Sequence, residues 1–274
     1  MSVTSSAAAI SAARASGRAA LIGYLPVGFP SVAGSLAALS TLCGADGSSE
    51  GVDLVEIGMP YSDPVMDGPV IQRAGTRALA RGVRTTDVFA AVEAVRAAGK
   101  PAVVMTYWNL VDRYGVDAFA RDLANAGGSG LITPDLIPDE AGEWLAASDA
   151  YGLDRVFLVS PSSTDERISM TAQAARGWLY ATAVMGVTGT RSASSDAAPK
   201  LVERIRSLAP GLPIGVGLGV SNGDQAAEIG RFADAVIVGS ALIKPLLVAD
   251  DAGTPEDLSG LRTVVADLVQ GVRR

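Results

Sequence analysis

Short apolar runs alternate with amphipathic segments along the chain. The apolar runs predict parallel β-strands that are covered on both faces. The predicted strands are 20–27, 52–58, 102–107, 130–134, 155–160, 178–184, 213–218 and 235–239. Segments of helical period lie between them, for example 116–127, 138–152, 198–209 and 222–233. Several of these segments begin after Asp, Ser or Asn and end at Gly, which is typical of capped helices.

Eight strand–helix units in 274 residues predict an α/β fold, a single (β/α)8 TIM barrel that spans residues 1–274 as one domain. A doubly wound parallel sheet is the alternative. The Ala/Ser-rich segment 1–18 has no continuous apolar core, so it predicts an extra N-terminal helix and not a signal peptide. In a barrel the active site lies at the C-terminal ends of the strands. The segment 45–51 precedes a strand and is therefore expected at the opposite, structural end.

Composition limits the possible partners. Hydrophobic residues make up 49% of the chain and charged residues 19%, which is sufficient for a large core. The net charge is −7 and no basic cluster occurs, so neither nucleic acid nor an anionic membrane is an expected partner. No apolar stretch is long enough to span a bilayer. Because the single cysteine, Cys43, cannot form an internal disulfide, we expect a cytoplasmic protein.

The chain contains no histidine, the commonest general acid or base near neutral pH. Proton transfer would therefore depend on carboxylates or tyrosines. The usual nitrogen and sulfur ligands of a zinc site are also missing, although a magnesium site built from carboxylates stays open. The only lysines, Lys100, Lys200 and Lys244, are not expected in the barrel mouth, so a Schiff-base lysine is not expected either.

Two acidic residues occur close together in the second strand–helix unit. Glu56 follows Leu54 in an apolar run, and Asp67 comes after a loop rich in Pro, Ser, Asp and Gly, just before a predicted helix. Two carboxylates at one barrel mouth can act as a general acid and a general base. A solvated rim position is the alternative for Glu56, but its apolar neighbours favour a buried acid. Glu56 and Asp67 are therefore the candidate catalytic residues.

Two glycine-rich turns follow the last two predicted strands, at 215–223 and 238–241. Barrel enzymes often bind phosphate with the loops at these positions and a helix N-terminus, using backbone amides. Glycines that serve only tight turns are the alternative. The polar segment 185–199, which includes Thr188, Gly189 and Arg191, has the composition of a mobile lid over a site, or of an ordinary surface loop.

The segment EIGMPYSDPVMDGPVIQ at 56–72 is similar to the signature ELGxPxSDPxxDGPxIQ of the tryptophan synthase alpha chain family. Further segments resemble the loops of this family in the same order along the chain. They are GYLPVGFP (23–30), MTYWN (105–109), TPDLIPDEA (133–141), MGVTGTR (185–191), GVGLGVS (215–221) and IVGSALIK (237–244). The resemblance extends over roughly residues 20–245.

The resemblance implies a lyase of tryptophan biosynthesis that cleaves indole-3-glycerol phosphate to indole and glyceraldehyde 3-phosphate by a retro-aldol reaction. Asp67 would take or hold the proton of the indole N–H, and Glu56 would act at C3 and the C3′ hydroxyl as acid and base in turn. The indole ring itself would be the electron sink, so this chain is expected to need no cofactor.

The resemblance also implies binding sites for the two ends of the substrate. An apolar pocket for the indole ring would consist of Tyr24, Met105, Ile132, Leu158, Tyr180 and Leu218. Backbone amides of Gly189, Gly219, Gly239 and Ser240 would bind the phosphate. Tyr180 could hydrogen-bond the substrate, or it is a core aromatic. Asp135 is interpreted as support for the Asp67 loop or the ring pocket.

The chain departs from the family in a few positions. Many members have Phe where this chain has Tyr24, Tyr61 and Leu218, which would alter the shape of the pocket and not the chemistry. The segment before the second strand is longer than expected, and it lies away from the predicted site. The N-terminal helix is similar to the family only in kind, as a plug beneath the barrel.

Family resemblance implies a partner, a beta chain that carries pyridoxal phosphate (PLP) and receives the indole, in an α2β2 heterotetramer. The expected docking surface consists of Pro60–Pro64, residues 108–115 and the loop after the sixth strand. Two alternatives remain: a free-standing lyase that releases indole, and a non-catalytic allosteric subunit that binds a phosphate ligand. A sugar-phosphate isomerase or epimerase is disfavoured because its usual histidine and metal ligands are missing.

Overall fold

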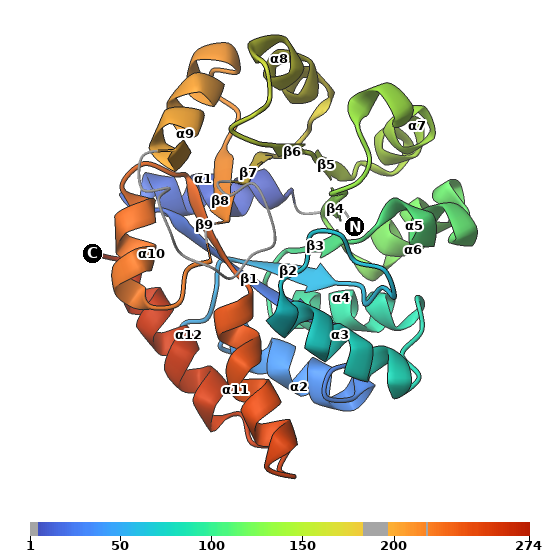
Figure 1. The fold of residues 1–274 in the computed structure, drawn as a ribbon, viewed down its shortest axis with the longest axis vertical. Helices are drawn as coiled ribbons and strands as arrows, with labels where there is room; N and C mark the ends of the chain where they lie inside the picture. The colour runs from blue at the N-terminus through green and yellow to red at the C-terminus, as the bar shows by residue number, and fades with distance from the viewer. Residues whose placement is uncertain (1–4, 183–196, 218) are drawn as a thin grey trace.

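The computed structural model describes residues 5–182, 197–217 and 219–274. A parallel sheet forms its centre, in the order β5-β4-β3-β2-β1-β9-β8-β7-β6 (Figure 1). Its strands are β1 (Ala20–Pro26), β2 (Leu54–Gly58), β3 (Ala102–Met105), β4 (Gly130–Ile132), β5 (Asp154–Val156), β6 (Leu158–Val159), β7 (Leu179–Thr182), β8 (Ile214–Gly217) and β9 (Ala235–Val238). All the paired strands run parallel. Each predicted strand is therefore found, most of them shorter than the apolar run.

The first and last strands of the sheet are consecutive in the chain. Val156 of β5 pairs with Ile132 of β4, and Leu158 of β6 pairs with Tyr180 of β7. Phe157 separates them, and its carbonyl oxygen accepts a hydrogen bond of 3.0 Å from the backbone N–H of Tyr180. The predicted strand 155–160 is thus divided in two, because its first half pairs with one neighbour and its second half with the other. This arrangement closes the sheet into a barrel, which confirms the predicted TIM barrel and excludes the doubly wound alternative.

Helices surround the barrel (Figure 1). They are α1 (Ser6–Ala15), α2 (Val32–Leu42), α3 (Pro69–Ala80), α4 (Asp87–Ala97), α5 (Trp108–Tyr114), α6 (Val116–Ala126), α7 (Gly142–Tyr151), α8 (Asp165–Ala174), α9 (Ala197–Leu208), α10 (Gly223–Gly230), α11 (Ser240–Asp251) and α12 (Ser259–Gly271), with a short 3₁₀ helix η1 (Pro138–Glu140). The predicted helix 138–152 is divided into η1 and α7, and the predicted helix 222–233 ends at Gly230. No helix in the described part of the chain is long and apolar enough to cross a membrane.

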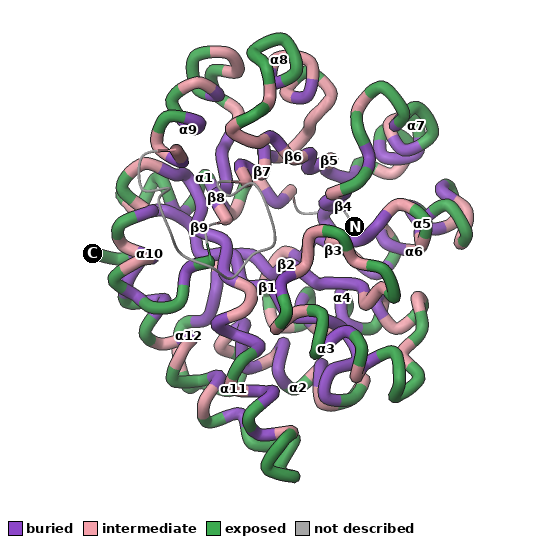
Figure 2. The backbone as a smooth tube through the Cα atoms, viewed as in Figure 1, coloured by how far each residue is buried: buried purple, intermediate pink, exposed green. Residues whose placement is uncertain are grey.

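Side-chain alternation along the strands creates two hydrophobic layers. Inward-facing residues such as Ile22, Leu54, Val103 and Ile132 form one cluster inside the barrel. Outward-facing neighbours such as Val55 pack against the helices in a second, larger cluster. Figure 2 shows the strands as buried and the outer faces of the helices as exposed. The period of two along each strand therefore decides which side chains can reach the interior of the barrel.

Helix α1 closes the N-terminal end of the barrel. Its Ile10 is fully buried in the inner cluster. The backbone N–H and the hydroxyl of Ser6 each donate to Asp154 Oδ2 at 2.7 Å, and Trp178 Nε1 donates to Ser6 Oγ at 3.1 Å. The prediction of an N-terminal helix that plugs the barrel is therefore confirmed, and the other end of the barrel is left for a site.

Segment 45–51 lies at the same end as α1, as predicted from its place before β2. Asp46 accepts a hydrogen bond of 2.8 Å from Arg262 of α12. Lys100, which precedes β3, donates to the backbone oxygen of Glu50 at 3.2 Å. Lys100 is therefore remote from the barrel mouth.

Candidate active site

Glu56 lies in the middle of β2 and faces the interior of the barrel, because it is two residues from the inward-facing Leu54. Its neighbours in the sheet are Tyr24 of β1 and Val103 of β3. The residue is 1% exposed, and Oε2 has no hydrogen-bond partner among the described residues. Burial, and then the charge of Asp67, raise the pKa of Glu56 to about 8. A buried carboxyl oxygen without a hydrogen-bond partner is unusual and indicates a functional role.

Asp67 lies in the irregular segment 59–68, which connects β2 to α3. The residue is half-buried, and burial raises the pKa of its carboxyl group to about 6. Its backbone oxygen accepts a hydrogen bond of 2.8 Å from Gln72 in the first turn of α3. Since the charge of Asp67 contributes to the raised pKa of Glu56, both carboxyl groups lie at the same mouth, as predicted.

The two carboxyl groups differ in protonation near neutral pH. Glu56, with a pKa of about 8, is mainly protonated at pH 7, whereas Asp67, with a pKa of about 6, is mainly ionised. Such a pair supplies a general acid and an anion at the same time, which is the usual result when two environments separate the pKa values of two carboxyls. Among the residues that the structure describes, no cluster of three or more Cys, Asp or Glu side chains could hold a metal ion.

Two tyrosines face the carboxyl pair from β1 and β7. Burial, followed by the charges of Asp67 and Glu56, raises the pKa of Tyr24 well above its usual value, and the same causes raise the pKa of Tyr180. Glycines make room for both rings. A Cβ atom at Gly58 would lie 2.1 Å from Tyr24 Oη, and one at Gly217 would lie 2.4 Å from Tyr180 Oη. Neutral phenol groups therefore adjoin the two acids.

The other residues predicted to bind an apolar ring lie beside these tyrosines. Met105, Leu158 and Tyr180 are partly buried and pack against the inner cluster that contains the fully buried Ile132. Tyr24 is next to Glu56 in the sheet register. The structure thus brings five of the six predicted residues to the inner wall of the barrel. The sixth, Leu218, is outside the described residues.

The glycine-rich turns follow β8 and β9 at the mouth of the barrel. Gly219 has a φ of +66° and is exposed, with open space where a side chain would begin. Gly239 precedes Ser240, the first residue of α11, and a Cβ atom at Gly239 would lie 3.5 Å from the ring of Tyr24. The N-terminus of a twelve-residue helix therefore borders the site, as a phosphate-binding arrangement requires. The predicted lid residues Thr188, Gly189 and Arg191 lie outside the described part of the chain.

Sequence reasoning assigned no role to Tyr107, although the structure places it against the Asp67 segment. Its hydroxyl oxygen accepts a hydrogen bond of 3.1 Å from the backbone N–H of Met66. The carboxylate of Asp135 in turn accepts from the backbone N–H of Trp108, at 2.9 and 3.1 Å. The sequence contains two signals for this residue: Tyr107 ends the predicted strand 102–107, where site residues of a barrel occur, and it lies in the segment MTYWN that resembles a loop of the family.

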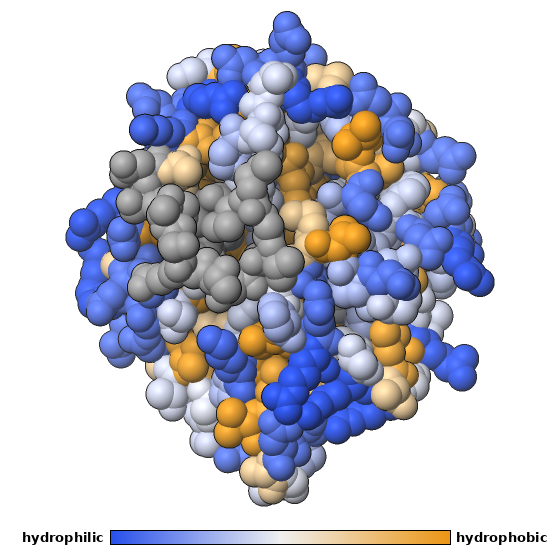
Figure 3. All heavy atoms as spheres, in the orientation of Figure 1, coloured by the Kyte–Doolittle hydropathy of each residue, from blue (hydrophilic) through white to orange (hydrophobic). Residues whose placement is uncertain are grey.

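The face that carries the mouth exposes hydrophobic side chains. In Figure 3 they occur near the centre of this face, whereas hydrophilic side chains predominate along its edge. Val65 is 72% exposed and Ile137 is 43% exposed, both in loops at the C-terminal ends of strands. Exposed apolar groups of this kind are typical of interaction surfaces.

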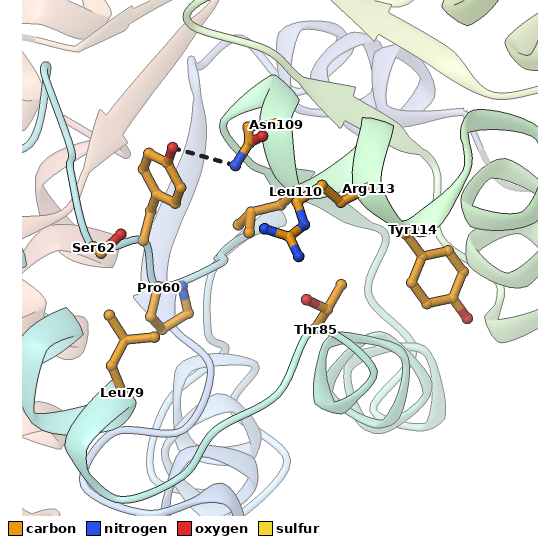
Figure 4. A pocket seen from close by; sticks show the side chains of 9 residues that line it. Pro60, Ser62, Leu79, Thr85, Asn109, Leu110, Arg113 and Tyr114 are labelled. Atoms are coloured by element: carbon orange, nitrogen blue, oxygen red, sulfur yellow. Dashed lines mark hydrogen bonds between the residues drawn. The ribbon is translucent and has the colours of Figure 1, made fainter.

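A pocket of about 420 Å³ lies outside the barrel beside the Asp67 segment. It is lined by Pro60, Tyr61, Ser62, Leu79, Thr85, Asn109, Leu110, Arg113 and Tyr114. Figure 4 shows the guanidinium group of Arg113 pointing into this pocket, and the hydrogen bond of 3.4 Å between Asn109 and the Tyr61 hydroxyl. The pocket therefore joins two of the segments predicted to form a docking surface, 60–64 and 108–115.

The chain is similar to known proteins over nearly its whole length. The family model of the tryptophan synthase alpha chain matches residues 10–266. The alpha chain of Salinispora tropica is 61% identical over 261 residues, which cover 95% of each chain, and that of Mycobacterium avium is 59% identical over 96% of this chain and 92% of its own. A solved structure of Mycobacterium tuberculosis tryptophan synthase superimposes with a TM-score of 0.90 at 55% identity, with complete coverage of both chains. The chain described here belongs to the tryptophan synthase alpha chain family.

Proposed function

We propose that Glu56 and Asp67 are the acid–base pair with which this chain cleaves indole-3-glycerol phosphate. Membership of the family gives the chain the role of an alpha subunit and a carbon–carbon lyase activity. The residue assignment rests on one observation: Glu56, which is buried and whose Oε2 has no hydrogen-bond partner among the described residues, has a pKa of about 8 beside the ionised Asp67 at the barrel mouth. Retention of this pair does not favour a non-catalytic subunit.

The first step is protonation of the substrate ring. Protonated Glu56 transfers its proton to C3 of the indole ring, which converts the ring to an indolenine cation. The carboxylate of Asp67 takes or holds the proton of the ring N–H and so stabilises the developing positive charge. Burial raises the pKa of Glu56 to about 8, so this group is mainly protonated at pH 7 and is available as the proton donor.

The second step breaks the carbon–carbon bond. The Glu56 carboxylate formed in the first step removes the proton of the C3′ hydroxyl, the C3–C3′ bond breaks, and its electron pair returns to the ring. A proton taken by Asp67 in the first step returns to the ring nitrogen at the same time. The products are indole and the aldehyde glyceraldehyde 3-phosphate. Glu56 ends the reaction protonated, as it began, so the cycle needs no external acid. Glu56 therefore acts as acid and base in turn, and the ring serves as the electron sink.

The two ends of the substrate differ in polarity, and so do the two sides of the mouth. The indole ring is placed against Tyr24, Met105, Leu158 and Tyr180, whose inner-wall positions exclude water from the ring. The phosphate is placed at the turns after β8 and β9, with Gly219, Gly239 and Ser240. The dipole and the free N–H groups of the first turn of α11 attract an anion without a lysine. Gly189 and Leu218 complete these two subsites in the proposal.

An alpha chain implies a beta chain as its partner. We infer an α2β2 assembly in the cytoplasm, in which the beta chain carries PLP and receives the indole released at this site. An apolar product benefits from a shielded path to its next enzyme, since water competes for it otherwise. The segments Pro60–Pro64 and 108–115, the pocket between them and the loop after β7 form the docking surface in this proposal.

Substitution of each acid tests the assignment. We expect Glu56→Gln and Asp67→Asn each to lower the rate of indole formation from indole-3-glycerol phosphate by about 10²–10⁴-fold, the usual contribution of a general acid or base. Glu143→Gln is the control, because Glu143 is an exposed acid in the first turn of α7, outside the site and the proposed docking surface. Its rate should equal that of the parent.

Indole fluorescence or extraction measures the rate, and circular dichroism verifies that each variant is folded. Near-parental activity of Glu56→Gln would remove Glu56 from the mechanism. The same assay with and without a beta chain distinguishes an alpha subunit from a free-standing lyase, because an alpha subunit should be slow alone and much faster with its partner. Fast release by the chain alone would instead indicate a free-standing lyase.

A further inference from the structure

The segment that carries Asp67 has little structure of its own. Residues 59–68 form neither helix nor strand, and Ser62, Asp63 and Val65 are exposed. Fixing such a segment costs conformational entropy for every residue, and side-chain carboxyls must be positioned closely to transfer protons. The contacts that hold this segment in place must therefore come from elsewhere in the barrel.

Tyr107 contacts the segment at two points. Its ring stacks on that of Tyr61, with the centroids 5.1 Å apart and the planes at 26°, near the start of the segment. Its hydroxyl oxygen accepts the hydrogen bond of 3.1 Å from the backbone N–H of Met66, directly before Asp67. Tyr107 thus spans the segment from its beginning to the acid, and it is only 4% exposed.

Tyr107 is itself held by the neighbouring strand and loop. The backbone N–H of Thr106 donates to Ile132 at the end of β4, at 3.1 Å. The carboxylate of Asp135 accepts the backbone N–H of Trp108 with both oxygens. The residues on either side of Tyr107 are therefore fixed to the β4 strand and its loop, so its ring has little freedom to move away from Met66.

We propose that Tyr107 is a positioning residue for Asp67, and that Asp135 supports it through the backbone of Trp108. The proposal rests on the proposed function, because it gives Asp67 a role in catalysis. Tyr107 acts through the backbone of Met66. Electrostatics agree with this proximity: burial raises the pKa of Tyr107 to about 12, and the charges of Asp67 and Asp135 contribute to the increase.

Tyr107→Phe removes the hydrogen-bond acceptor and retains the stacked ring. We expect kcat for indole formation to fall roughly tenfold and KM to change less than twofold, since one neutral hydrogen bond accounts for about that factor. The looser segment exposes Asp67 to water, so the acid limb of the pH–rate profile should move to lower pH. Besides Tyr107, the titratable groups around Asp67 are Glu56, Tyr24 and Tyr180, which this variant leaves unchanged.

Tyr151→Phe is the matched control. Tyr151 also has a hydrogen-bonded hydroxyl, which donates to Asp117 at 3.1 and 3.2 Å, and it is the last residue of α7, outside the site and the proposed docking surface. Its kcat and pH profile should equal those of the parent. If Tyr107→Phe has the kcat and the acid limb of the parent, or if Tyr151→Phe causes the same changes, the positioning role is wrong.

Asp135 gives a second, independent comparison. Asp135→Asn retains an oxygen that can accept the Trp108 N–H, so its activity should remain within about twofold of the parent. Asp135→Ala has no acceptor and should lose kcat as Tyr107→Phe does. Equal losses in both variants would mean that the charge of Asp135 matters and not its hydrogen bond, which would overturn its supporting role.

Amide hydrogen exchange separates this proposal from the proposed function. The Met66 amide should exchange faster in Tyr107→Phe than in the parent, and at the parental rate in Tyr151→Phe. A parent chain that does not cleave indole-3-glycerol phosphate would overturn the proposed function alone. Parental exchange at Met66 in Tyr107→Phe would overturn the contact, whatever the activity of the chain.

Discussion

At the scale of single residues, the site buries the carboxyl group of Glu56 without a hydrogen bond from any described residue to Oε2 that would offset the loss of contact with water. Glu56 is surrounded by a sheet of apolar side chains, and its Oε2 has no hydrogen-bond partner among the described residues. A buried acid in this condition avoids the cost of a charge by retaining its proton. Asp67, half-buried in a loop, ionises more easily. The environment thus gives two chemically similar groups opposite protonation states.

The protonation states predict a bell-shaped pH dependence of kcat/KM for indole formation. The rate should rise as Asp67 ionises near pH 6 and fall as Glu56 loses its proton near pH 8, with a maximum near pH 7. Because the two groups interact, these values belong to the pair. Initial rates at constant ionic strength between pH 5 and 9.5 measure the profile. A rate that is constant from pH 5.5 to 8.5 would contradict the assignment.

The same burial predicts that Glu56→Gln stabilises the fold at alkaline pH. The folded pKa is about 8 and the ordinary value is 4.5, so the folded chain retains a proton that the unfolded chain releases between these values. Stability that depends on this proton is complete below pH 4.5 and is lost as the pH rises to 8. The Gln variant has no such loss, so its advantage should reach roughly 4–5 kcal/mol above pH 8.

Urea unfolding of the parent and of Glu56→Gln at pH 5, 7 and 9 measures this difference. Glu143→Gln in α7 is the control, because Glu143 is exposed and its substitution should have the same small effect at each pH. A stability difference for Glu56→Gln that does not grow with pH would mean that Glu56 is ionised in the folded chain.

At the scale of elements, strand patterns were sufficient to predict the barrel. Parallel strands covered on both faces must be apolar runs, and eight such runs with helices between them have few possible arrangements. The interruption at Phe157 was not predictable, because nothing in the local sequence marks a break there and only the closure of the barrel assigns the two halves to different neighbours. Helix ends were also imprecise, since a pattern does not show where η1 gives way to α7.

The burial of the proposed catalytic acid Glu56 was predictable from sequence, whereas the contacts that support the Asp67 segment were not. Glu56 combines an acid with an apolar run, so its burial and raised pKa follow from local sequence. The contact between Tyr107 and Met66 joins two loops that are 41 positions apart, and it depends on the order of strands in the sheet. No local pattern contains such information. Side chains that support a site are therefore harder to find from sequence than those that perform the chemistry.

Helix α1 should stabilise the barrel without affecting the reaction. Ile10 is fully buried in the inner cluster, so Ile10→Ala should lower the free energy of unfolding by about 2–5 kcal/mol. Ser11→Ala on the exposed side of α1 should change it by less than about 0.5 kcal/mol. Urea unfolding measures both. Indole formation at a temperature where Ile10→Ala is folded should equal the parental rate, and a large loss of kcat would mean that α1 contributes to the site.

At the scale of the whole molecule, the acids at the two ends of the barrel differ in their partners. Asp53, which precedes β2, forms two hydrogen bonds of 2.7 Å with Arg18, and Asp234, which precedes β9, accepts from Arg206 at 2.9 Å. These acids lie at the N-terminal end, where side chains serve stability. Glu56 and Asp67 lie toward the C-terminal end, with raised pKa values. Asp53 and Asp234 at one end therefore stabilise the fold through their arginine partners, whereas Glu56 and Asp67, with raised pKa values toward the other end, are available for proton transfer.

The exposed apolar groups of the mouth face and the pocket beside it predict where the beta chain binds. Arg113 is exposed, forms no ion pair among the described residues and points into the pocket (Figure 4). Arginine is frequent among the residues that dominate binding at interfaces, because its planar group forms several hydrogen bonds when covered. Arg113→Ala should therefore raise the beta-chain concentration for half-maximal activation by about tenfold, and leave the rate without the beta chain unchanged.

Arg121→Ala is the control for this measurement, since Arg121 is an equally exposed arginine on α6 that pairs with Asp122, outside the predicted docking surface. Titration of each variant with a beta chain, with indole formation as the signal, gives the concentration for half-maximal activation. Equal values for both variants and the parent would place the interface away from the pocket. A selective change for Arg113→Ala would instead support partner binding at the pocket. The segment that lines the pocket at Pro60–Ser62 continues to Asp67, so a partner bound there would contact the same loop that carries the proposed catalytic acid.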